Sequence, residues 1–469
     1  MNETSQPTDL FLPLTRQSRR PLCAQVEDQL RRAIRSGVLV PGTRLPSTRD
    51  LATQLDISRG VVVNAYAQLG AEGYLVLRPR SRARISDFGG PRSTPAEVTL
   101  GDQRPRFDFR LGAPDVSRFP RTVWVRCLRT ALLAMSNADL GYGDERGVER
   151  LRAALAEYLG RVRGVVADPE RVVVTSGYLQ AQGLVCRALA STGRKRIAFE
   201  DPSDAEPRVS AARAGLEVVP IGVDEAGLRI DELERAVVDA VVVTPAHQFP
   251  TGAVLAPARR AALLEWLRRR DAVAIEDDYD AEYRYDRSPV GALQGLDPDR
   301  VVYAGSASKT LAPALRIGWL VVPRRLLGSV ANEKLLADRG TARIEQHAFA
   351  EFLDRGELDR HLRRMRTRYR RRRDALVCAL ADELPDATVE GIAAGLHAAV
   401  RLTDDDDETA ILEEARRRRI ALGTIQQFAI EPTGGPPTIL LGYAQTPEAT
   451  IRAGVAEFAD MVRALRRRS

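Results

Sequence analysis

Lysine is almost missing from this sequence. Only three of its 70 basic residues are lysines, namely Lys195, Lys309 and Lys334, and all the others are arginines. Arginine is therefore the default cation of the chain, and a lysine in a polar motif stands out. The amine of a lysine can form a Schiff base with an aldehyde, which a guanidinium cannot do.

Cysteine is also scarce, and long apolar runs are absent. The four cysteines show no CxxC pair and no metal-ligand spacing, so the sequence predicts reduced, buried thiols and no metal site. No apolar run approaches the roughly 20 residues that a membrane-spanning helix needs. The segment from Met1 to Thr15 lacks a basic region followed by an apolar core, so we expect no signal peptide there.

The length and charge of the chain indicate several domains and an anionic partner. At 469 residues it is long enough for two or more domains, each with its own core. The formal net charge is +7, and residues 1–87 hold 13 arginines against 8 acidic residues. Because this first fifth of the chain carries most of the net charge, it is the expected nucleic-acid-binding part.

The first 87 residues have the pattern of three short helices followed by a basic hairpin. Apolar residues recur at helical spacing after Pro21, Ser47 and Ser58, and turn signals separate the three stretches. The two serines are favourable N-cap residues. The run 74–77 predicts a strand that leads to a basic wing at 78–84. Together these features predict a winged helix-turn-helix, in which the start of the third helix meets base edges in the major groove.

This segment closely resembles the GntR-type DNA-binding domain. The resemblance rests on PGTRLPSTR at 41–49, on the Ser-Arg pair at 58–59 and on AEGYL at 71–75. It implies DNA contacts by Arg44, Ser47, Arg49, Ser58 and Arg59. The wing of the family usually reads Gly-Ser-Gly, whereas this chain has Arg80, Ser81 and Arg82. We expect the two wing arginines to add phosphate or minor-groove contacts, although solvated surface charge is the alternative.

Hydrophobic periodicity disappears between residues 88 and 106, where glycine, proline, serine and threonine prevail. Such a composition predicts a linker. The expected organisation is therefore a winged helix-turn-helix domain at 1–87, a linker at 88–106 and a large domain at 107–469.

From residue 107 onward, helical stretches alternate with short β-rich runs. Several of these runs are apolar throughout, which is typical of a mostly parallel sheet buried on both faces. The predicted strands are 171–175, 196–199, 217–220, 240–244, 272–276, 301–305 and 318–322. Ligands of such α/β sheets bind beyond the carboxyl ends of the strands, so we expect the site there.

Polar motifs follow four of these strands. Ser176 and Gly177 open a helix whose backbone N–H groups suit a phosphate, and further motifs occupy 244–252 and 276–280. The fourth, GSASKT, contains Lys309 between small hydroxyl residues, with an arginine seven positions later. Hydroxyls and a guanidinium suit a phosphate dianion. A lysine in such surroundings is expected to hold pyridoxal 5′-phosphate.

The four motifs, taken in order, closely resemble fold type I of the pyridoxal-phosphate enzymes, the aminotransferase fold. The resemblance implies a mostly parallel central sheet with a smaller C-terminal α+β part. It also implies that Lys309 holds the cofactor as a Schiff base, that Asp277 pairs with the pyridinium nitrogen and that Tyr279 hydrogen-bonds the ring hydroxyl oxygen.

The same resemblance assigns further cofactor contacts. Ser306, Ser308 and Arg316 are expected to bind the phosphate. His247 and its neighbour Gln248 lie where that fold places an asparagine near the ring oxygen. Tyr142 matches a tyrosine that reaches the phosphate of the partner subunit, which implies a homodimer with shared sites.

A GntR-type DNA-binding domain joined to an aminotransferase-like domain is the architecture of the MocR-type transcriptional regulators. The chain resembles this family along nearly its whole length. The resemblance implies a cytoplasmic bacterial homodimer that binds double-stranded operator DNA and senses a small amine or the B6 cofactor itself. Three features depart from the family pattern. Asp204 replaces a tyrosine that stacks on the cofactor ring, Tyr178-Leu179 replaces small or amide residues, and the stretch 438–443 lacks an arginine for a substrate carboxylate.

Two functions remain open. In the first, the protein is a transcriptional regulator and its large domain is the sensor, with no catalytic role beyond a residual transaminase half-reaction. In the second, the chain is an active aminotransferase with a secondary DNA-binding part. The missing carboxylate arginine favours the first. The arginine-rich stretch 361–373 predicts a solvated helix face, with DNA contact as the alternative.

Overall fold

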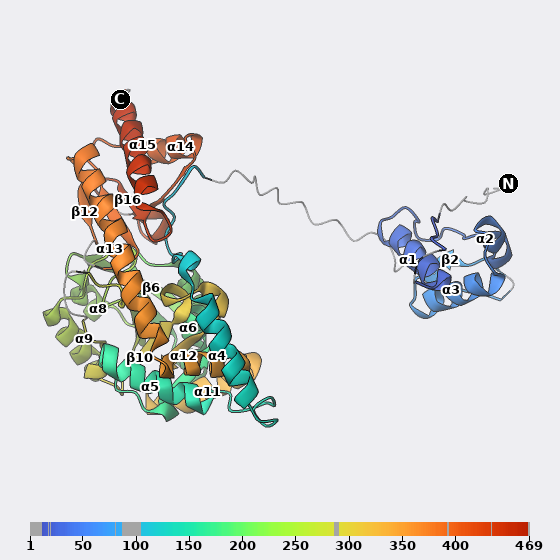
Figure 1. Cartoon of the computed structure of the whole chain (residues 1–469). Coiled ribbons are helices and arrows are strands. Elements are labelled where there is room, and N and C mark those ends of the chain that lie inside the picture. The colour runs from blue at the N-terminus through green and yellow to red at the C-terminus, as the bar shows by residue number, and fades with distance from the viewer. Residues whose placement is uncertain are drawn as a thin grey trace. The chain divides into compact units, whose positions relative to one another are not determined.

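The structure is a computed structural model that describes residues 12–16, 18, 20–79, 81–86, 105–285, 290–391, 394–432 and 434–467. Its internal contacts divide the chain into an N-terminal unit, Met1–Gln103, and a C-terminal unit, Arg104–Ser469, both drawn in Figure 1. Nearly all of the predicted linker, residues 88–104, lies outside the described residues, and so does Arg80 of the predicted wing.

The N-terminal unit contains three helices and a two-stranded hairpin. The elements are α1 (Leu22–Arg35), α2 (Thr48–Gln54), α3 (Arg59–Ala71), β1 (Leu75–Val76) and β2 (Arg84–Ile85), and the two strands pair antiparallel. Buried side chains from all three helices, among them Val26, Leu51 and Val62, share one core. Apolar spacing along each helix thus produces the common packed face that the sequence predicts.

The two predicted N-caps differ in the structure. Ser47 caps α2 with its hydroxyl, which accepts the backbone N–H of Asp50 at 3.1 Å. Ser58 occupies the N-cap position of α3, but its side chain makes no cap hydrogen bond. The prediction that Ser58 caps the third helix is therefore correct for its N-cap position, but wrong for the side-chain hydrogen bond that a cap would make.

The C-terminal unit is built on a large, mostly parallel sheet. Among the described residues it has eight strands in the order β4-β11-β10-β9-β8-β5-β6-β7. The neighbours from β10 to β6 pair in parallel, whereas β11 and β7 run antiparallel to their neighbours. The bounds are β4 (Val172–Thr175), β5 (Arg196–Asp201), β6 (Glu217–Asp224), β7 (Gly227–Leu228), β8 (Ala240–Val243), β9 (Val273–Asp277), β10 (Val301–Ser306) and β11 (Gly318–Val321).

Both faces of this sheet are covered by helices. Val172 and Val174 of β4 join one buried cluster, whereas Val173 joins another, because alternate residues of a strand point to opposite faces. The surrounding helices are α4 (Arg121–Ala134), α5 (Glu149–Arg163), α6 (Tyr178–Ser191), α7 (Ala205–Arg213), α8 (Ile230–Arg235), α9 (Pro257–Arg270), α10 (Ala307–Thr310), α11 (Arg324–Asp338) and α12 (Arg343–Asp354). Two-sided burial explains why these strands are apolar throughout.

A smaller part follows at the C-terminal end of the chain, as the resemblance implies. It contains an antiparallel sheet in the order β12-β13-β16-β15, and its short β14 pairs in parallel with β3 near the start of the unit. The bounds are β3 (Phe107–Asp108), α13 (Glu357–Glu383), β12 (Thr388–Glu390), β13 (His397–Arg401), α14 (Glu408–Arg417), β14 (Ile420–Ala421), β15 (Gly423–Thr424), β16 (Thr438–Gly442) and α15 (Glu448–Arg466). Figure 1 shows α13 running from this part toward α5 and α12.

The arginines of α13 correct a prediction. Arg368 and Arg372 pair with Asp115 at 2.8 and 2.9 Å, and Arg366 donates to the backbone carbonyl of Glu282 at 2.8 Å. Arg372 is buried. The predicted solvated face is therefore wrong for these three residues, which join α13 to the rest of the unit.

The cysteines and helices test two further predictions. Cys127 and Cys186 are buried and Cys23 is half-buried, but Cys378 is exposed, so the prediction of buried thiols fails at that position. All four are free thiols. Within the described ranges, no helix has both the length and the apolar character required to span a bilayer.

Candidate functional site

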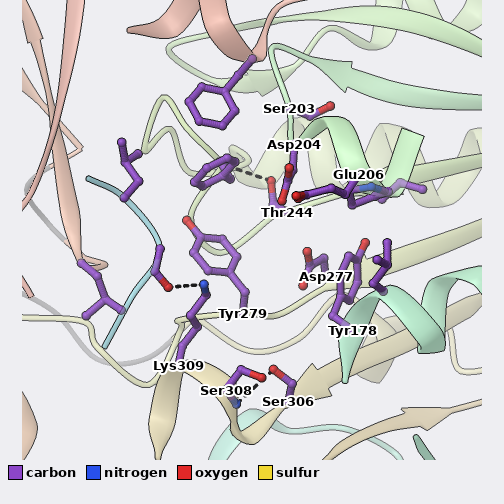
Figure 2. A pocket seen from close by; sticks show the side chains of 18 of the residues that line it. Tyr178, Ser203, Asp204, Glu206, Thr244, Asp277, Tyr279, Ser306, Ser308 and Lys309 are labelled. Carbon is purple, nitrogen blue, oxygen red and sulfur yellow. Dashed lines mark hydrogen bonds between the residues drawn. The ribbon is translucent and has the colours of Figure 1, made fainter. Parts of the chain in front are cut away.

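A cavity of about 610 Å³ lies at the carboxyl ends of β5, β8, β9 and β10. Its wall also includes the starts of α6 and α7, the segment 111–113 and residues of the C-terminal part. Figure 2 shows it from close by. Six of the predicted cofactor residues lie on this wall: Asp277, Tyr279, Ser306, Ser308, Lys309 and Arg316.

Lys309 lies on the short helix α10, which directly follows β10. The hydroxyl of Ser306 accepts the backbone N–H of Ser308 at 3.3 Å and thereby caps this helix. The Lys309 amine donates to the carbonyl of Gly112 on the cavity wall. Burial lowers the pKa of this amine below its ordinary value, although the nearby Asp280 and Asp277 oppose the shift. A larger unprotonated fraction makes the amine a better nucleophile.

Asp277 ends β9 and points into the cavity between Tyr279 and Tyr178, as Figure 2 shows. Burial raises the pKa of its carboxyl well above the ordinary value, and the negative charges of Asp278 and Asp204 add to the shift. A cation bound against this carboxyl would favour its charged form. The site therefore suits a ligand with a positive group at this point.

His247 lies behind Tyr279, and it is not part of the cavity wall. Its Nδ1 lies 2.8 Å from the Tyr279 hydroxyl and 3.0 Å from a carboxylate oxygen of Asp280. Gln248 donates to the carbonyls of Pro202 and Phe249 at 2.8 and 2.7 Å. His247 thus reaches the cavity through Tyr279, and Gln248 holds the surrounding loop.

The predicted phosphate residues gather at one end of the cavity. Figure 2 shows Ser306 and Ser308 side by side at that end. Arg316 also lines the wall and has a left-handed backbone with φ 51°. Gly177 has φ 106°, and a Cβ there would lie 3.0 Å from an Arg316 guanidinium nitrogen. Glycine at 177 therefore permits both the turn before α6 and the close approach of the arginine.

Ser176 and Tyr142 are placed differently from the residues on the wall. The backbone N–H of Ser176 donates to the side chain of Gln180 at 2.7 Å, so this donor is already used. Tyr142 is 87% exposed and lies outside the cavity of its own chain. The guanidinium of Arg339 lies 5.5 Å from the centre of its ring.

The structure adds wall residues that the sequence motifs did not single out. Glu206, His397 and Phe428 line the cavity. Burial lowers the pKa of His397 to about 4, so the ring is neutral, and its Nε2 lies 3.0 Å from the carbonyl of Pro250. His397 is a lone histidine at the start of β13, and Phe428 ends the short 3-10 helix Ile425–Phe428, so no sequence motif marks either residue.

A buried ion pair lies directly beside Asp277. The Arg163 guanidinium meets both carboxylate oxygens of Asp278 at 2.7 and 3.0 Å, and the Tyr303 hydroxyl donates to one of them at 2.6 Å. The two charged side chains are only 2% and 1% exposed. Because Asp278 follows Asp277 in the chain, this pair fixes the end of β9 at the site.

Replacement of Asp278 by alanine is expected to destabilise the protein by about 3–5 kcal/mol, because it leaves the Arg163 guanidinium buried without its partner. Urea unfolding of the full chain measures this loss. Asp231→Ala is the matched control, since the Arg235–Asp231 pair is 69% and 53% exposed and such pairs contribute at most about 1 kcal/mol. Equal losses for both variants would contradict the expected role of the buried pair.

The predicted DNA-contacting residues lie around the starts of α2 and α3. Arg44, Arg49, Ser58 and Arg59 are exposed, and Ser47 is half-buried by its capping contact. Arg59 Nε lies 3.5 Å from the Thr48 hydroxyl, which links the two helix starts.

The hairpin adds a further cation on the same side of the unit. Arg82 lies 3.7 Å from Asp50 in an exposed ion pair, and such pairs contribute little to stability. A hollow of about 470 Å³ separates the hairpin from α2 and α3, and both Arg82 and Ser47 line it. The described arginines are thus available to an external anion.

Comparisons with known proteins agree with both parts of the chain. The family described as "Bacterial regulatory proteins, gntR family" matches residues 22–85, and the family described as "Aminotransferase class I and II" matches residues 110–457. These matches confirm the predicted GntR-type and aminotransferase-like regions.

Two relatives match along nearly the whole chain. The HTH-type pyridoxine biosynthesis transcriptional regulator PdxR of Corynebacterium glutamicum is 32% identical over 97% of this chain and 99% of its own length. The probable rhizopine catabolism regulatory protein MocR of Rhizobium meliloti is 33% identical over 95% of this chain and 94% of its own. Among solved structures, the multiple substrate aminotransferase from Thermococcus profundus has a TM-score of 0.72 at 25% identity, covering 80% of this chain and 96% of that one.

Proposed function

The chain belongs to the MocR-type regulators of the GntR family, and from this premise we propose that it is a DNA-binding transcriptional regulator that senses a small amine through bound pyridoxal 5′-phosphate. One observation carries the proposal. The chain has an exposed arginine, Arg59, at the start of the predicted DNA-contacting helix. The same chain has a cavity whose wall brings together Lys309, Asp277 and the predicted phosphate-binding residues.

Pyridoxal 5′-phosphate fits the residues on the cavity wall. When bound, it supplies an aldehyde that condenses with primary amines. Lys309 would hold the aldehyde, because its amine lies in the cavity with a lowered pKa. Asp277 would pair with the protonated ring nitrogen, which favours the charged form of its carboxyl. The hydroxyls of Ser306 and Ser308 and the Arg316 guanidinium would bind the phosphate.

The aromatic ring of Tyr178 also supports a planar cofactor. It lies on the cavity wall next to Asp277, as Figure 2 shows. Asp204 has no stacking face where the family commonly has a tyrosine. Tyr178 would supply an aromatic contact that Asp204 cannot, worth about 0.5–1.5 kcal/mol in aromatic pairs.

The charges on the wall favour sensing over amino-acid turnover. Among the described wall residues, Lys309 and Arg316 are the only lysine and arginine, and His397 is neutral. Lys309 is assigned to the aldehyde and Arg316 to the phosphate. The described wall therefore offers no further cation for the carboxylate of an amino acid, which an aminotransferase needs to orient its substrate.

A homodimer would complete the site. Tyr142 is exposed together with large apolar side chains on α4 and α11, which include Val125, Leu133 and Leu336. Exposed apolar side chains in such numbers are typical of protein interfaces. A second copy that covers them would bring Tyr142 to the partner's phosphate, as the resemblance implies. Binding to chromosomal DNA would place this dimer in the bacterial cytoplasm.

Contacts across the cavity indicate how an amine would alter the protein. The Ser203 backbone N–H donates to the Phe428 carbonyl at 3.0 Å, and Asp201 accepts the N–H groups of Ile430 and Glu431 at 2.8 and 3.1 Å. These bonds join the wall of the large sheet to the C-terminal part. An amine that contacts both sides would change their closure, and the linker would pass this change on as a new spacing of the two DNA-binding units.

Steady-state turnover and DNA binding distinguish the regulator from an active aminotransferase. We expect the purified full-length protein to bind its operator differently with and without pyridoxal 5′-phosphate and a primary amine. We expect no sustained turnover with a panel of amino acids and 2-oxo acids. Efficient turnover, together with DNA binding that is unchanged by pyridoxal 5′-phosphate and by the amine, would show that the protein is an active aminotransferase.

A further inference from the structure

Two acidic side chains share the end of the cavity that lies away from the phosphate-type residues. Asp204 is the N-cap residue of α7 and Glu206 lies in its first turn, and both line the wall. Figure 2 shows them at the opposite end from Ser306 and Ser308, with Asp277 between. The cavity therefore has a cationic end and an acidic end.

The two carboxyl groups lie near each other on the cavity wall, as Figure 2 shows. The neighbouring Asp204 carboxyl is the main reason that the pKa of Glu206 is raised. Two neighbouring carboxyl groups favour a proton on one of them, because two like charges repel each other. A cation placed between them would replace that proton and leave both groups charged.

No described cation satisfies this pair. The structure shows no ion pair between either carboxylate and a described lysine or arginine; Arg208 is near enough to Asp204 to feel its charge, but it is not on the wall. The hydroxyl of Ser203, beside the pair, is buried and lacks a hydrogen-bond partner among the described residues. The two carboxyl groups thus form an acceptor set on the cavity wall.

We propose that this acidic end binds the distal ammonium group of an aliphatic diamine, so that the effector is a diamine and neither a simple amine nor an amino acid. The inference rests on the proposed function, which places the first amine of the effector at the Lys309 end. Asp204, Glu206 and Lys309 all line the same cavity, so both ends face one space. A distal ammonium gains charge-assisted hydrogen bonds there, a methyl group gains none, and a carboxylate is repelled.

Calorimetric titration of the full-length protein, reconstituted with pyridoxal 5′-phosphate, tests the proposal with three ligands of four carbons each. We expect putrescine to bind at least tenfold more tightly than n-butylamine, and γ-aminobutyrate to bind more weakly than either. Asp204→Asn and Glu206→Gln should each abolish the preference for putrescine while leaving the affinity for n-butylamine within twofold. Glu225→Gln, an exposed acid elsewhere in the unit, is the matched control and should keep the preference.

The visible absorbance of each sample distinguishes a failure of cofactor binding from a failure of the diamine preference. A protein that stays colourless with pyridoxal 5′-phosphate contradicts the proposed function itself. A coloured protein that binds the three ligands equally, or a preference for putrescine that survives in both acidic variants, overturns only the diamine assignment. The same holds if Mg²⁺ displaces putrescine at equal concentration, since the pair would then be a metal-binding site.

Discussion

Replacement of Lys309 by alanine is expected to remove the visible absorbance that the protein has with pyridoxal 5′-phosphate, and with it the response of DNA binding to amines. The cofactor would keep its ring contact with Asp277 and its phosphate contacts with Ser306, Ser308 and Arg316, but no residue would hold its aldehyde. Absorption spectra of the dialysed protein and DNA-binding titrations with and without amine measure the two losses.

Lys195→Ala provides the matched control for this change. It removes one of the three lysines from an exposed position outside the cavity, so both the absorbance and the amine response should persist. The Lys309→Ala protein should remain folded, because the buried amine already carries a desolvation cost that lowers its pKa. If the variant still responds to amines at the wild-type concentration, Lys309 is not the sensor.

The large sheet was predictable because most of its strands, such as β4, β8 and β11, are buried throughout. All seven predicted strands match β4, β5, β6, β8, β9, β10 and β11 within a few residues. The two-residue strand β7 and most of the C-terminal sheet were not anticipated. Their strands are short and are completed by partners far along the chain, such as β12 against β13. Local periodicity cannot reveal a pairing that depends on distant contacts.

The sequence predicted most directly those cavity residues that end a strand. Asp277 and Ser306 end β9 and β10, and so they reach the cavity as expected. His247 lies in a motif of the same kind, but its ring packs behind Tyr279 and meets Asp280. Position in a loop does not fix the direction of a side chain.

Charge patterns in the sequence were the least reliable guide to the burial and partners of side chains. The arginines of α13 looked solvated, since arginine usually is, yet Arg372 is buried because Asp115 lies opposite it. The acidic partner is more than 250 residues away in the sequence. Conversely, the sequence marked Asp204 only as a residue that replaces a ring-stacking tyrosine. The structure adds Glu206 to the same cavity wall, and the two together are the acceptor that we propose for a distal ammonium group.

Replacement of Arg59 by alanine is expected to weaken operator binding by about 1–3 kcal/mol, the usual range for loss of an arginine that contacts a base. The residue begins α3, is exposed, and lies next to Thr48 at the start of α2. Affinity can be measured on a duplex that the wild-type protein selects from a random library. Arg32→Ala, in the exposed last turn of α1, is the matched control and should bind like the wild type.

The salt dependence of the Arg59→Ala variant decides what the arginine contacts. If Arg59 reads a base, the variant should accept other bases at one position while the slope of affinity against salt stays unchanged. If it binds a phosphate, the slope should fall by about one unit and all sequences should lose affinity equally. An unchanged affinity would mean that the start of α3 does not face DNA. Because Arg59 and Lys309 belong to different units, the variant should keep its visible absorbance in either case, and loss of both properties would point to misfolding instead.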